Sequence, residues 1–408
     1  MKKAIVLGGT LPHVTLIEKL KKRGFEVILV DYLENPYAKK YADRHIQAST
    51  LDLEVVTKIA KDENVDLVIS TCIDQANATA CYVSEQLGLP HPYSYETAID
   101  VTDKLKMKEI MVSNHIPTSK YMRIKKADDS GLSTLSYPLI VKPVDCNSSK
   151  GVQKIESPDS PLEEAIETAV RLSRTKEAII EEYVTGIEVG IDTFVVNGQA
   201  HVLMIKERRK VQKNNGGIQQ ILGCTWPMPG YEAILPEAQR IANLIAQSFK
   251  LQNCALMIQA IIDSRNTINV IEFGARIGGG ESFRIIKNST SFDYVEASIN
   301  SFLGEEVSLD FHAPVGYYAD NFIYSHKCIF DRIQCPEELL SDGTIAYLNA
   351  LKPSGVEIDE QITSSNRVGV AVVKADSVDE LYGKIERTIK SLEVYDIDNK
   401  SVMRKDIY

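Results

Sequence analysis

Short apolar runs alternate with amphipathic stretches over the first hundred residues. The runs KKAIVLG, EVILVD and DLVIS are each bounded by glycine or polar residues, which is typical of strands buried on both faces of a parallel sheet. Between them, VTLIEKLKKRG and LEVVTKIAKDEN carry apolar residues at helical spacing. Residues 1–100 are therefore predicted to form an α/β domain built on a doubly wound parallel sheet.

Beyond residue 100 the pattern becomes mixed α+β. A helix is predicted from near Thr102, and LIVKP and GVQKI are predicted strands on either side of DCNSSK. The run from Ser160 to Glu163 has the pattern of a capping box with proline at the first helical position, and AIIEEY is a further predicted strand. EVGIDTFVV and QAHVLMIKE flank Asn197-Gly198, which favours a β-hairpin.

The second half of the chain continues this mixture. A helix is predicted from Pro236 to Phe249 and leads into a second hairpin. Near the end, VGVAVVKA is a predicted strand, and Ser377 is expected to cap a helix that ends near Leu392. We see no internal repeat and no low-complexity linker.

Composition excludes several classes of protein. The chain has 408 residues, enough for two or three domains, and a formal net charge of −10 argues against sequence-independent nucleic-acid binding. No apolar run approaches the ~20 residues that span a bilayer, and the apolar start is too short for a signal peptide. Seven scattered cysteines without a CxxC pair fit reduced thiols. We therefore expect a cytoplasmic protein with neither membrane nor nucleic acid as a partner.

The most informative stretch is INVIEFGARIGGG, which follows the strand ALMIQAIID. If Asp263 pairs with Ile268 across a four-residue loop, Gln259 lies opposite Glu272, and opposed side chains are ~5 Å apart. Two oxygen donors at that distance are able to share one metal ion. Arg276 and three glycines follow the acid and suit a phosphorylated intermediate. The alternative is a plain β-hairpin with a surface acid.

Two lysines and a polar loop are candidates for phosphate binding. Lys104 lies on a helix, and Lys142 ends the apolar run YPLIV, where a charged residue is uncommon. Lysines from separate elements are able to clamp a polyphosphate as point charges. The loop DCNSSKGV adds hydroxyls and free backbone N–H groups, although it is not a Walker loop. The alternatives are solvated surface lysines and an ordinary turn.

An acidic strand end follows in AIIEEYVTGIEVGID. Adenine needs a backbone donor and acceptor between apolar faces, which Glu181 to Val184 would offer. A carboxylate such as Glu188 suits a ribose diol. The alternative is a strand end with solvated acids.

The order of these segments resembles the ATP-grasp superfamily. The matching stretches are DKLKMKE, YPLIVKPVDCNSSKGV, IIEEYVTGIE and VIEFGARIGGG, and the similarity is greatest to carboxylate–amine ligases, namely amino-acid ligases, phosphoribosylglycinamide synthetase and carbamoyl phosphate synthase-like units. The resemblance implies an ATP-grasp fold with an N-terminal α/β domain (1–100), a nucleotide-binding region (101–305) that contains a lid at about 115–185, and a C-terminal α+β domain (306–408).

The resemblance also implies roles for individual residues. Arg276 and Lys142 would be catalytic, and Gln259 and Glu272 would hold Mg²⁺ or Mn²⁺. The residues implied to bind ATP are Lys104, Lys142, Ser148, Ser149, Lys150, Gly151, Val152, Glu181, Glu182, Tyr183, Val184 and Glu188.

Two departures from the usual pattern bear on the metal site. Many members of the family have a carboxylate where this chain has Gln259, and many have an asparagine where it has Gly274. Magnesium prefers six oxygens and fills gaps with water. The number of ions, one or two, therefore stays open.

The acceptor side is less defined. The GGT loop fails the GxGxxG dinucleotide pattern, and the resemblance makes Gly9 and Thr10 candidate substrate contacts. A basic cluster after a strand is expected either to face a substrate anion or to be a solvated strand end. The other substrate candidates are Lys206, Arg208, Gly278 and Gly279.

The resemblance implies an ATP-dependent ligase that activates a small carboxylate as an acyl phosphate and couples it to an amine, with an amino acid among the substrates. ADP and phosphate would be released, and a homodimer is common in the family. Two alternatives stay open: a purine-pathway ligase similar to phosphoribosylglycinamide synthetase, and an ATP-binding protein without ligase activity.

Overall fold

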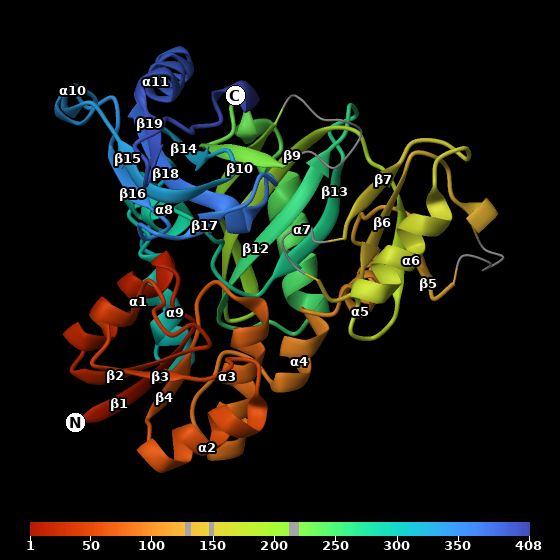
Figure 1. The fold of residues 1–408 in the computed structure, drawn as a ribbon. Coiled ribbons are helices and arrows are strands. Elements are labelled where there is room, and N and C mark those ends of the chain that lie inside the picture. Colours follow the sequence, from red (N-terminus) through yellow and green to blue (C-terminus); the bar gives the residue numbers. More distant parts are fainter. Residues whose placement is uncertain (127–131, 147–150, 212–219) are drawn as a thin grey trace.

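The N-terminal region is a parallel sheet with helices packed on it (Figure 1). In this computed structural model, residues 1–126, 132–146, 151–211 and 220–408 are described. The sheet has four strands in the order β3-β2-β1-β4, all paired in parallel, as the apolar runs predict. Helix α9, from much later in the chain, contacts both α1 and β4 and so joins this region to the rest. The elements are β1 (Lys2–Leu7), α1 (Leu11–Lys22), β2 (Phe25–Asp31), β3 (Arg44–Gln47), α2 (Leu53–Glu63), β4 (Leu67–Ile69), α3 (Asp74–Leu87), α4 (Tyr95–Asp100) and α5 (Lys104–Ser113).

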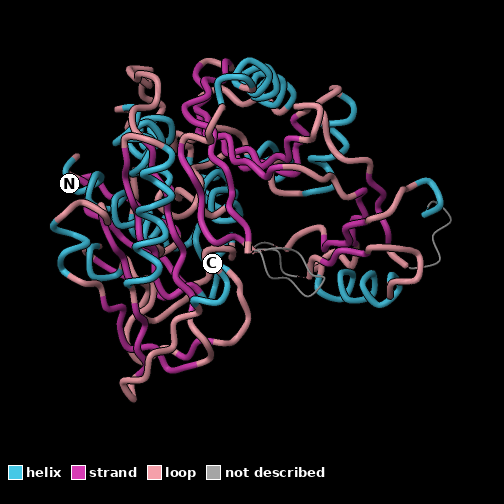
Figure 2. The backbone as a smooth tube through the Cα atoms, turned by 90° about the horizontal axis from the view of Figure 1, so that it is seen from above, coloured by secondary structure: helices cyan, strands magenta, loops and turns pink. Residues whose placement is uncertain are grey.

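A small antiparallel sheet projects to one side of the molecule (Figure 2). Its four strands have the order β5-β8-β6-β7, and α6 packs against β6 and β8. It has its own apolar core, which includes Ile124, Val141, Ile166 and Ile180. The elements are β5 (Tyr121–Ile124), β6 (Leu139–Pro143), β7 (Gln153–Ile155), α6 (Leu162–Leu172) and β8 (Ala178–Glu182).

The predicted capping box before α6 is not formed. The N-cap residue is Pro161, which has no side-chain cap, and the Ser160 hydroxyl instead accepts a hydrogen bond from the Ser157 amide (3.2 Å). The prediction was wrong because a local turn competes for the same hydroxyl.

The centre of the molecule is an antiparallel sheet of eight strands in the order β13-β12-β9-β10-β11-β14-β18-β16 (Figure 1). The Asn197-Gly198 turn joins β9 to β10, with both residues at positive φ (50° and 78°) as this hairpin turn requires. The strands and helices are β9 (Ile187–Val196), β10 (Gln199–Lys210), β11 (Ile221–Trp226), α7 (Leu235–Ser248), β12 (Cys254–Ile262), β13 (Ile268–Gly274), α8 (Ser282–Thr290), α9 (Tyr294–Leu303), β14 (Tyr317–Tyr324), β16 (Tyr347–Ala350) and β18 (Arg367–Ala375).

The C-terminal hundred residues extend this sheet and add a second, smaller one. Strand β14 pairs with β11, β18 pairs with β14 and β16 pairs with β18, while β17-β15-β19 form a separate three-stranded sheet. The central sheet is therefore shared across the boundary predicted at residues 305 and 306, and the division into domains stays a prediction. The Ser377 side chain caps α11 by accepting from the Glu380 amide, as predicted. The remaining elements are β15 (Cys328–Gln334), α10 (Glu337–Ser341), β17 (Glu357–Ile358), α11 (Val378–Ser391) and β19 (Glu393–Asp396).

All seven cysteines are free. Among the described residues, no helix combines the length and apolar character needed to cross a bilayer.

Candidate functional site

The hairpin of β12 and β13 places Gln259 opposite Glu272, as the sequence predicts. The route to this pairing differs from the expected one. The ladder begins with Ile262 opposite Ile268, one residue away from the predicted register, and a bulge between Gln259 and Ala260 restores it. The predicted loop register was therefore wrong, and the predicted pair was right.

The Gln259 amide bridges Glu272 and Arg208. The hydrogen-bond network assigns its orientation: Nε2 donates to Oε1 of Glu272 (2.9 Å), and the amide oxygen accepts from Nη2 of Arg208 (3.3 Å). Arg208 in turn lies 2.8 Å from Oε1 of Glu188 through its Nε, and Lys210 pairs with the other oxygen. The predicted ribose acid and the predicted metal pair are thus linked through one arginine.

These side chains share one face of the central sheet because alternate residues of a strand point to the same side. Gly190, on β9, lies opposite Gln259 of β12 on one side and opposite Lys206 of β10 on the other. A Cβ at Gly190 would lie 2.5 Å from the Lys206 stem, so a glycine is needed for the lysine to lie across the strand. The row therefore runs from Glu272 through Gln259 and Gly190 to Lys206.

Helix α5 brings Lys104 to this face. The Asp103 side chain caps the helix by accepting from the amides of Leu105 (2.9 Å) and Lys106 (3.1 Å), which fixes the helix start next to Lys104. The Lys104 ammonium lies 3.5 Å from Oε2 of Glu272 and donates to the carbonyl of Cys146 (2.9 Å).

Glu272 is the electrostatic centre of the site. Burial opposes its ionisation, but surrounding cations outweigh burial and hold the pKa of the carboxyl below its usual range. Its side chain retains 35% exposure, so the carboxylate is open to a ligand. The cations, in decreasing order of effect, are Lys104, Lys142, Arg208 and Arg276.

Glu181 anchors the second predicted phosphate lysine. Its Oε1 lies 2.5 Å from the Lys142 ammonium, and its Oε2 lies 3.3 Å from the ammonium of Lys108. The Ser119 hydroxyl donates to Oε2 as well (2.8 Å). Although burial opposes ionisation, the two lysines lower the pKa of Glu181 to about 2. Glu181 therefore acts through its side chain, which holds Lys142.

Lys108 is a member of this network that the sequence analysis missed. Its side chain is 1% exposed and also donates to Thr118 (2.5 Å) and Ser119 (3.0 Å). Burial lowers its pKa to about 8, against the opposing charge of Glu181. The signal was present in the helical spacing, since Leu105, Lys108 and Met111 lie three residues apart on the buried face of α5.

The strand end after Glu181 offers a backbone edge. The amides of Glu182 and Tyr183 donate to the carbonyls of Lys120 (2.9 Å) and Pro138 (2.8 Å). The amide of Val184 makes no hydrogen bond with any described residue. The Tyr183 ring lies under the Lys154 ammonium at 4.2 Å, and the Glu182 carboxylate accepts from the Ser136 amide (2.9 Å).

The predicted phosphate loop is only partly described. Ser148, Ser149 and Lys150 lie outside the described residues. Gly151 has a positive φ of 73°, and a Cβ there would lie 2.6 Å from Leu172. Val152 is half-buried and precedes β7.

Arg276 faces the N-terminal sheet. Its guanidinium donates two bonds to Asp74 at 2.8 and 2.9 Å. The Cys72 thiol lies beside this pair. Burial raises the pKa of that thiol, while the Arg276 charge lowers it. The predicted contact Thr10 reaches the same place, since its hydroxyl lies 3.5 Å from the Cys72 sulfur.

The backbone at the neighbouring Gly9 is held by the carboxylate of Asp31. Its amide donates to Oδ2 of Asp31 (2.7 Å), and the other oxygen of that carboxylate accepts from Leu33 (2.8 Å). The Gly9 loop therefore lies at the carboxyl ends of β1 and β2, the edge where ligands bind in such sheets.

The remaining substrate candidates split into two places. Arg208 contacts Glu188 and Gln259 of the predicted ribose and metal sites, whereas Lys206 pairs with Asp192 (2.7 Å) and lies 5.3 Å from the Trp226 ring centroid. A Cβ at Gly278 would lie 3.4 Å from the Lys206 ammonium, so this lysine and the glycine run meet. Gly279 next to it faces open space within 4 Å.

Comparison with known proteins identifies the domain that these elements build. Residues 135–283 match the family described as an ATP-grasp domain. The chain therefore contains an ATP-grasp domain. The phosphoribosylamine–glycine ligase of Pyrococcus horikoshii is 24% identical over 408 aligned residues, which cover 93% of this chain and 89% of the relative.

Two amino-acid ligases are similar as well. The L-arginine-specific L-amino acid ligase of Bacillus subtilis is 23% identical over 298 aligned residues, which cover 70% of this chain and 71% of the relative. The crystal structure of an L-amino acid ligase from Bacillus licheniformis has a TM-score of 0.82 at 21% identity and covers 97% of this chain and 99% of that one. The predicted ATP-grasp fold and the predicted enzyme class, a ligase, are confirmed.

The ATP-grasp site fits a magnesium ion that arrives with the nucleotide. Among the described residues, no group of three or more His, Cys, Asp or Glu side chains could hold a metal ion. Mg²⁺ bound with a nucleotide needs only one or two carboxylates, because phosphates and water complete its shell. Glu272 supplies one ionised carboxylate, while the Gln259 oxygen faces Arg208.

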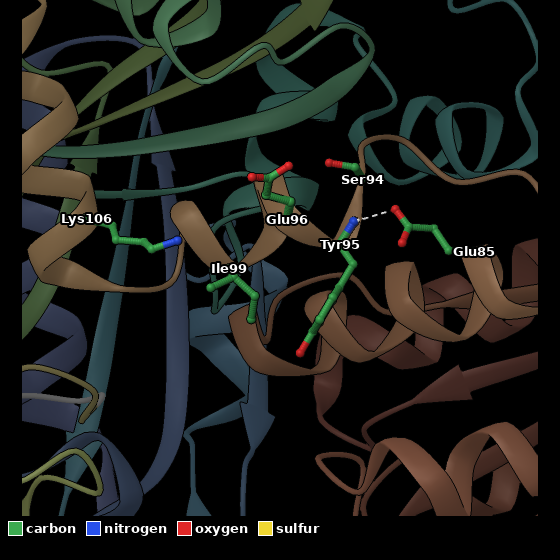
Figure 3. Close-up of a pocket in the computed structure, with 6 residues that line it drawn as sticks. All are labelled: Glu85, Ser94, Tyr95, Glu96, Ile99 and Lys106. Carbon is green, nitrogen blue, oxygen red and sulfur yellow. Dashed lines mark hydrogen bonds between the residues drawn. The ribbon is translucent and has the colours of Figure 1, made fainter.

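The pocket in Figure 3 is separate from this ATP-grasp site. It has a volume of about 490 Å³ and lies among α3, α4 and α5. Glu85 accepts a hydrogen bond from the Tyr95 amide there (2.6 Å), the dashed line in Figure 3. The residues that line it, none of which is a predicted site residue, are Glu85, Ser94, Tyr95, Glu96, Ile99 and Lys106.

Proposed function

We propose that the protein is an ATP-dependent ligase that phosphorylates a small carboxylate and couples it to an amine, with an amino acid among the substrates. The observation that carries this proposal is the convergence on Glu272. Lys104 comes from α5, Lys142 from the small sheet, Arg208 from β10 and Arg276 from the segment after β13, and each of the four charges lowers the pKa of this carboxyl.

That convergence matches the charges of a metal-bound triphosphate. Four cationic segments surround one open carboxylate, which is an arrangement that neutralises phosphate oxygens and still leaves a ligand for the accompanying cation. We assign Lys104 and Lys142 to the phosphates and Glu272 to Mg²⁺. Bound Mg²⁺ would offset negative charge on the phosphates.

Adenine would bind at the strand end after Glu181. The Val184 amide, which has no described partner, is placed as the hydrogen-bond donor, and the Tyr183 ring offers an apolar edge. Glu188 would bind the ribose diol. It is now paired with Arg208 and Lys210, so we expect those pairs to rearrange when the ribose binds.

The proposed reaction has two steps. An oxygen of the substrate carboxylate attacks the γ-phosphorus, ADP leaves, and an acyl phosphate forms. The amine nitrogen then attacks the acyl carbon, its proton is lost to solvent, and the C–O bond to phosphate breaks. We assign Arg276 and the backbone of Gly278 and Gly279 to the stabilisation of the oxyanion in the second step.

The test is a substrate screen with two readouts. The protein is incubated with Mg-ATP and pools of amino acids and small carboxylates, while ADP and phosphate are measured. Product release that requires a particular acid–amine pair supports the proposal. Calorimetry with Mg-ATP measures nucleotide binding separately. No binding at millimolar nucleotide would contradict the proposal, because the reaction requires bound ATP.

A second candidate is a phosphoribosylamine–glycine ligase. It is favoured by the relative from Pyrococcus horikoshii, whose similarity extends over 93% of this chain. Phosphoribosylamine with glycine is therefore included as one substrate pair. Turnover with that pair, and with no pair of two amino acids, would select the second candidate over the first.

A further inference from the structure

Arg276 is held by an acid of the N-terminal region. Its Nε donates to Oδ1 of Asp74 at 2.8 Å, and its Nη2 donates to Oδ2 at 2.9 Å. These two parallel bonds are the fork that fits a guanidinium to a carboxylate. Asp74 is the first residue of α3, and the positive end of a helix favours a negative charge at that position.

The pair leaves one edge of the guanidinium without a hydrogen-bond partner among the described residues. Nη1 donates a third bond, to the carbonyl of Ile277 at 3.0 Å. An arginine has five side-chain N–H groups, so two remain after these three bonds, one on each terminal nitrogen. Two such groups side by side match the oxygens of a carboxylate or a phosphate.

Gly274 makes room for the pair. A Cβ at this position would lie 2.5 Å from Oδ1 of Asp74 and 3.3 Å from Nε of Arg276. The first distance is shorter than a real Cβ contact, and the atom it meets is already fixed by a hydrogen bond. A side chain at Gly274 therefore displaces Asp74.

The segment from Gly274 to Ile277 is fastened to the N-terminal region by two more bonds. The Ile277 amide donates to the carbonyl of Thr71 (3.1 Å), and the buried Tyr93 hydroxyl donates to the carbonyl of Ala275 (2.8 Å). The backbone on both sides of Arg276 is therefore fixed from the same direction as its side chain.

We infer that Asp74 is a positioning residue for the ligase reaction. It holds the Arg276 guanidinium so that the free fork faces the acyl phosphate, and Gly274 is required because a Cβ would displace Asp74. The role assigned to Arg276 rests on the proposed function, whereas the pair itself does not. The N-terminal sheet thus contributes to the chemical step as well as to the substrate side.

A double-mutant cycle tests the inference by kinetics. Asp74→Ala is expected to lower kcat by about tenfold through misorientation of Arg276, with the nucleotide Kd changed by less than about twofold. In an Arg276→Ala background, Asp74→Ala is expected to cause no further loss. Equal fold-losses in both backgrounds would show that Asp74 acts independently of Arg276 and would overturn the inference.

Two further variants complete the test: Glu63→Gln is the control for losing an arginine–carboxylate pair, and Gly274→Ala tests the role of the glycine. Glu63→Gln disrupts the fork between Glu63 and Arg44 (2.7 and 2.8 Å), which joins α2 to β3 outside the site, so turnover should not change. Gly274→Ala should lower kcat as Asp74→Ala does, and adding it to Asp74→Ala should lower kcat no further. An additional loss in the combined variant would contradict the link between Gly274 and Asp74.

A stability cycle tests the pair of Asp74 and Arg276 even if no substrate is found. Denaturant unfolding of Asp74→Ala, Arg276→Ala and the double variant should show coupling. The folding equilibrium constant of the double variant should fall at least about fivefold less than the product of the two single-variant decreases. No coupling overturns the inference whatever the activity. Coupling together with a wild-type protein that releases no ADP in any pool means that the proposed function fails and the pair stands.

Discussion

The Lys142 ammonium lies 2.5 Å from Oε1 of Glu181, and both side chains are buried. The glutamate also faces the ammonium of Lys108 at 3.3 Å. Two cations thus share one anion behind the phosphate site, and the anion determines where Lys142 points. Glu181 is therefore expected to matter for both stability and nucleotide binding.

Replacing Glu181 with glutamine should destabilise the fold strongly. Two buried lysines would lose their counter-charge, and breaking such a buried pair costs about 3–5 kcal/mol. Urea unfolding measures the loss. The exposed pair of Glu386 and Lys390 is the control, because solvent screens it and Glu386→Gln should leave the free energy of unfolding nearly unchanged. A Glu181→Gln variant as stable as the control would show that the network does not stabilise the fold.

The same pair predicts a pH dependence at acid pH. The pKa of Glu181 is lowered in the folded state from its usual 4.5 to about 2, so its stabilising contribution is present above pH 4.5 and is lost as the pH falls towards 2. The difference in unfolding free energy between wild type and Glu181→Gln should shrink as the pH falls below about 5. A difference that grows on acidification would have the wrong sign.

The adenine assignment is testable at one backbone atom. Val184→Pro removes the amide N–H, whereas Val184→Ala keeps it and serves as the control. Loss of one hydrogen bond to the base should weaken ATP binding by about tenfold, measured by calorimetry. Equal affinities for the two variants would place adenine elsewhere.

The metal assignment is testable at Gln259. A carboxylate binds Mg²⁺ more tightly than an amide oxygen, and Arg208 lies close enough to offset the added charge. Gln259→Glu should therefore lower the Mg²⁺ concentration for half-maximal nucleotide binding by about tenfold, while Gln259→Ala should not lower it. The same shift in both variants would show that residue 259 is not a ligand.

Arg276→Ala tests the stabilisation of the oxyanion. Removing one such donor is typically worth ~3 kcal/mol, so kcat should fall on the order of a hundredfold. Nucleotide affinity should change little, since Arg276 is assigned to the acyl phosphate. Near-normal ADP release at saturating substrates would contradict its role.

Some site features were readable from local patterns. The hairpin at Asn197-Gly198 forms because only a few residues accept positive φ at both turn positions, and that requirement is local. The pairing of Gln259 with Glu272 was predicted as well, although the loop register was wrong by one residue. A bulge corrected it, and bulges depend on how a strand packs against its other neighbour, here β9.

Other features depend on packing between distant segments. Lys108 was missed although its helical spacing matches the buried face of α5, because a lysine is buried only where partners such as Ser119 and Glu181 satisfy its charge. Arg208 was assigned to the substrate side, yet the register of β9 and β10 brings it to Glu188.

The sequence by itself determined the strands and helices that carry the predicted site residues, their approximate bounds and the ATP-grasp resemblance, because these follow from local periodicity, turn residues and short motifs. Tertiary structure alone decided which charges meet. Asp74 and Arg276 are 202 residues apart in the chain, and no local pattern joins them. Their contact depends on how the N-terminal sheet docks on the central one, and a guanidinium pairs with whichever carboxylate that docking brings within hydrogen-bond distance.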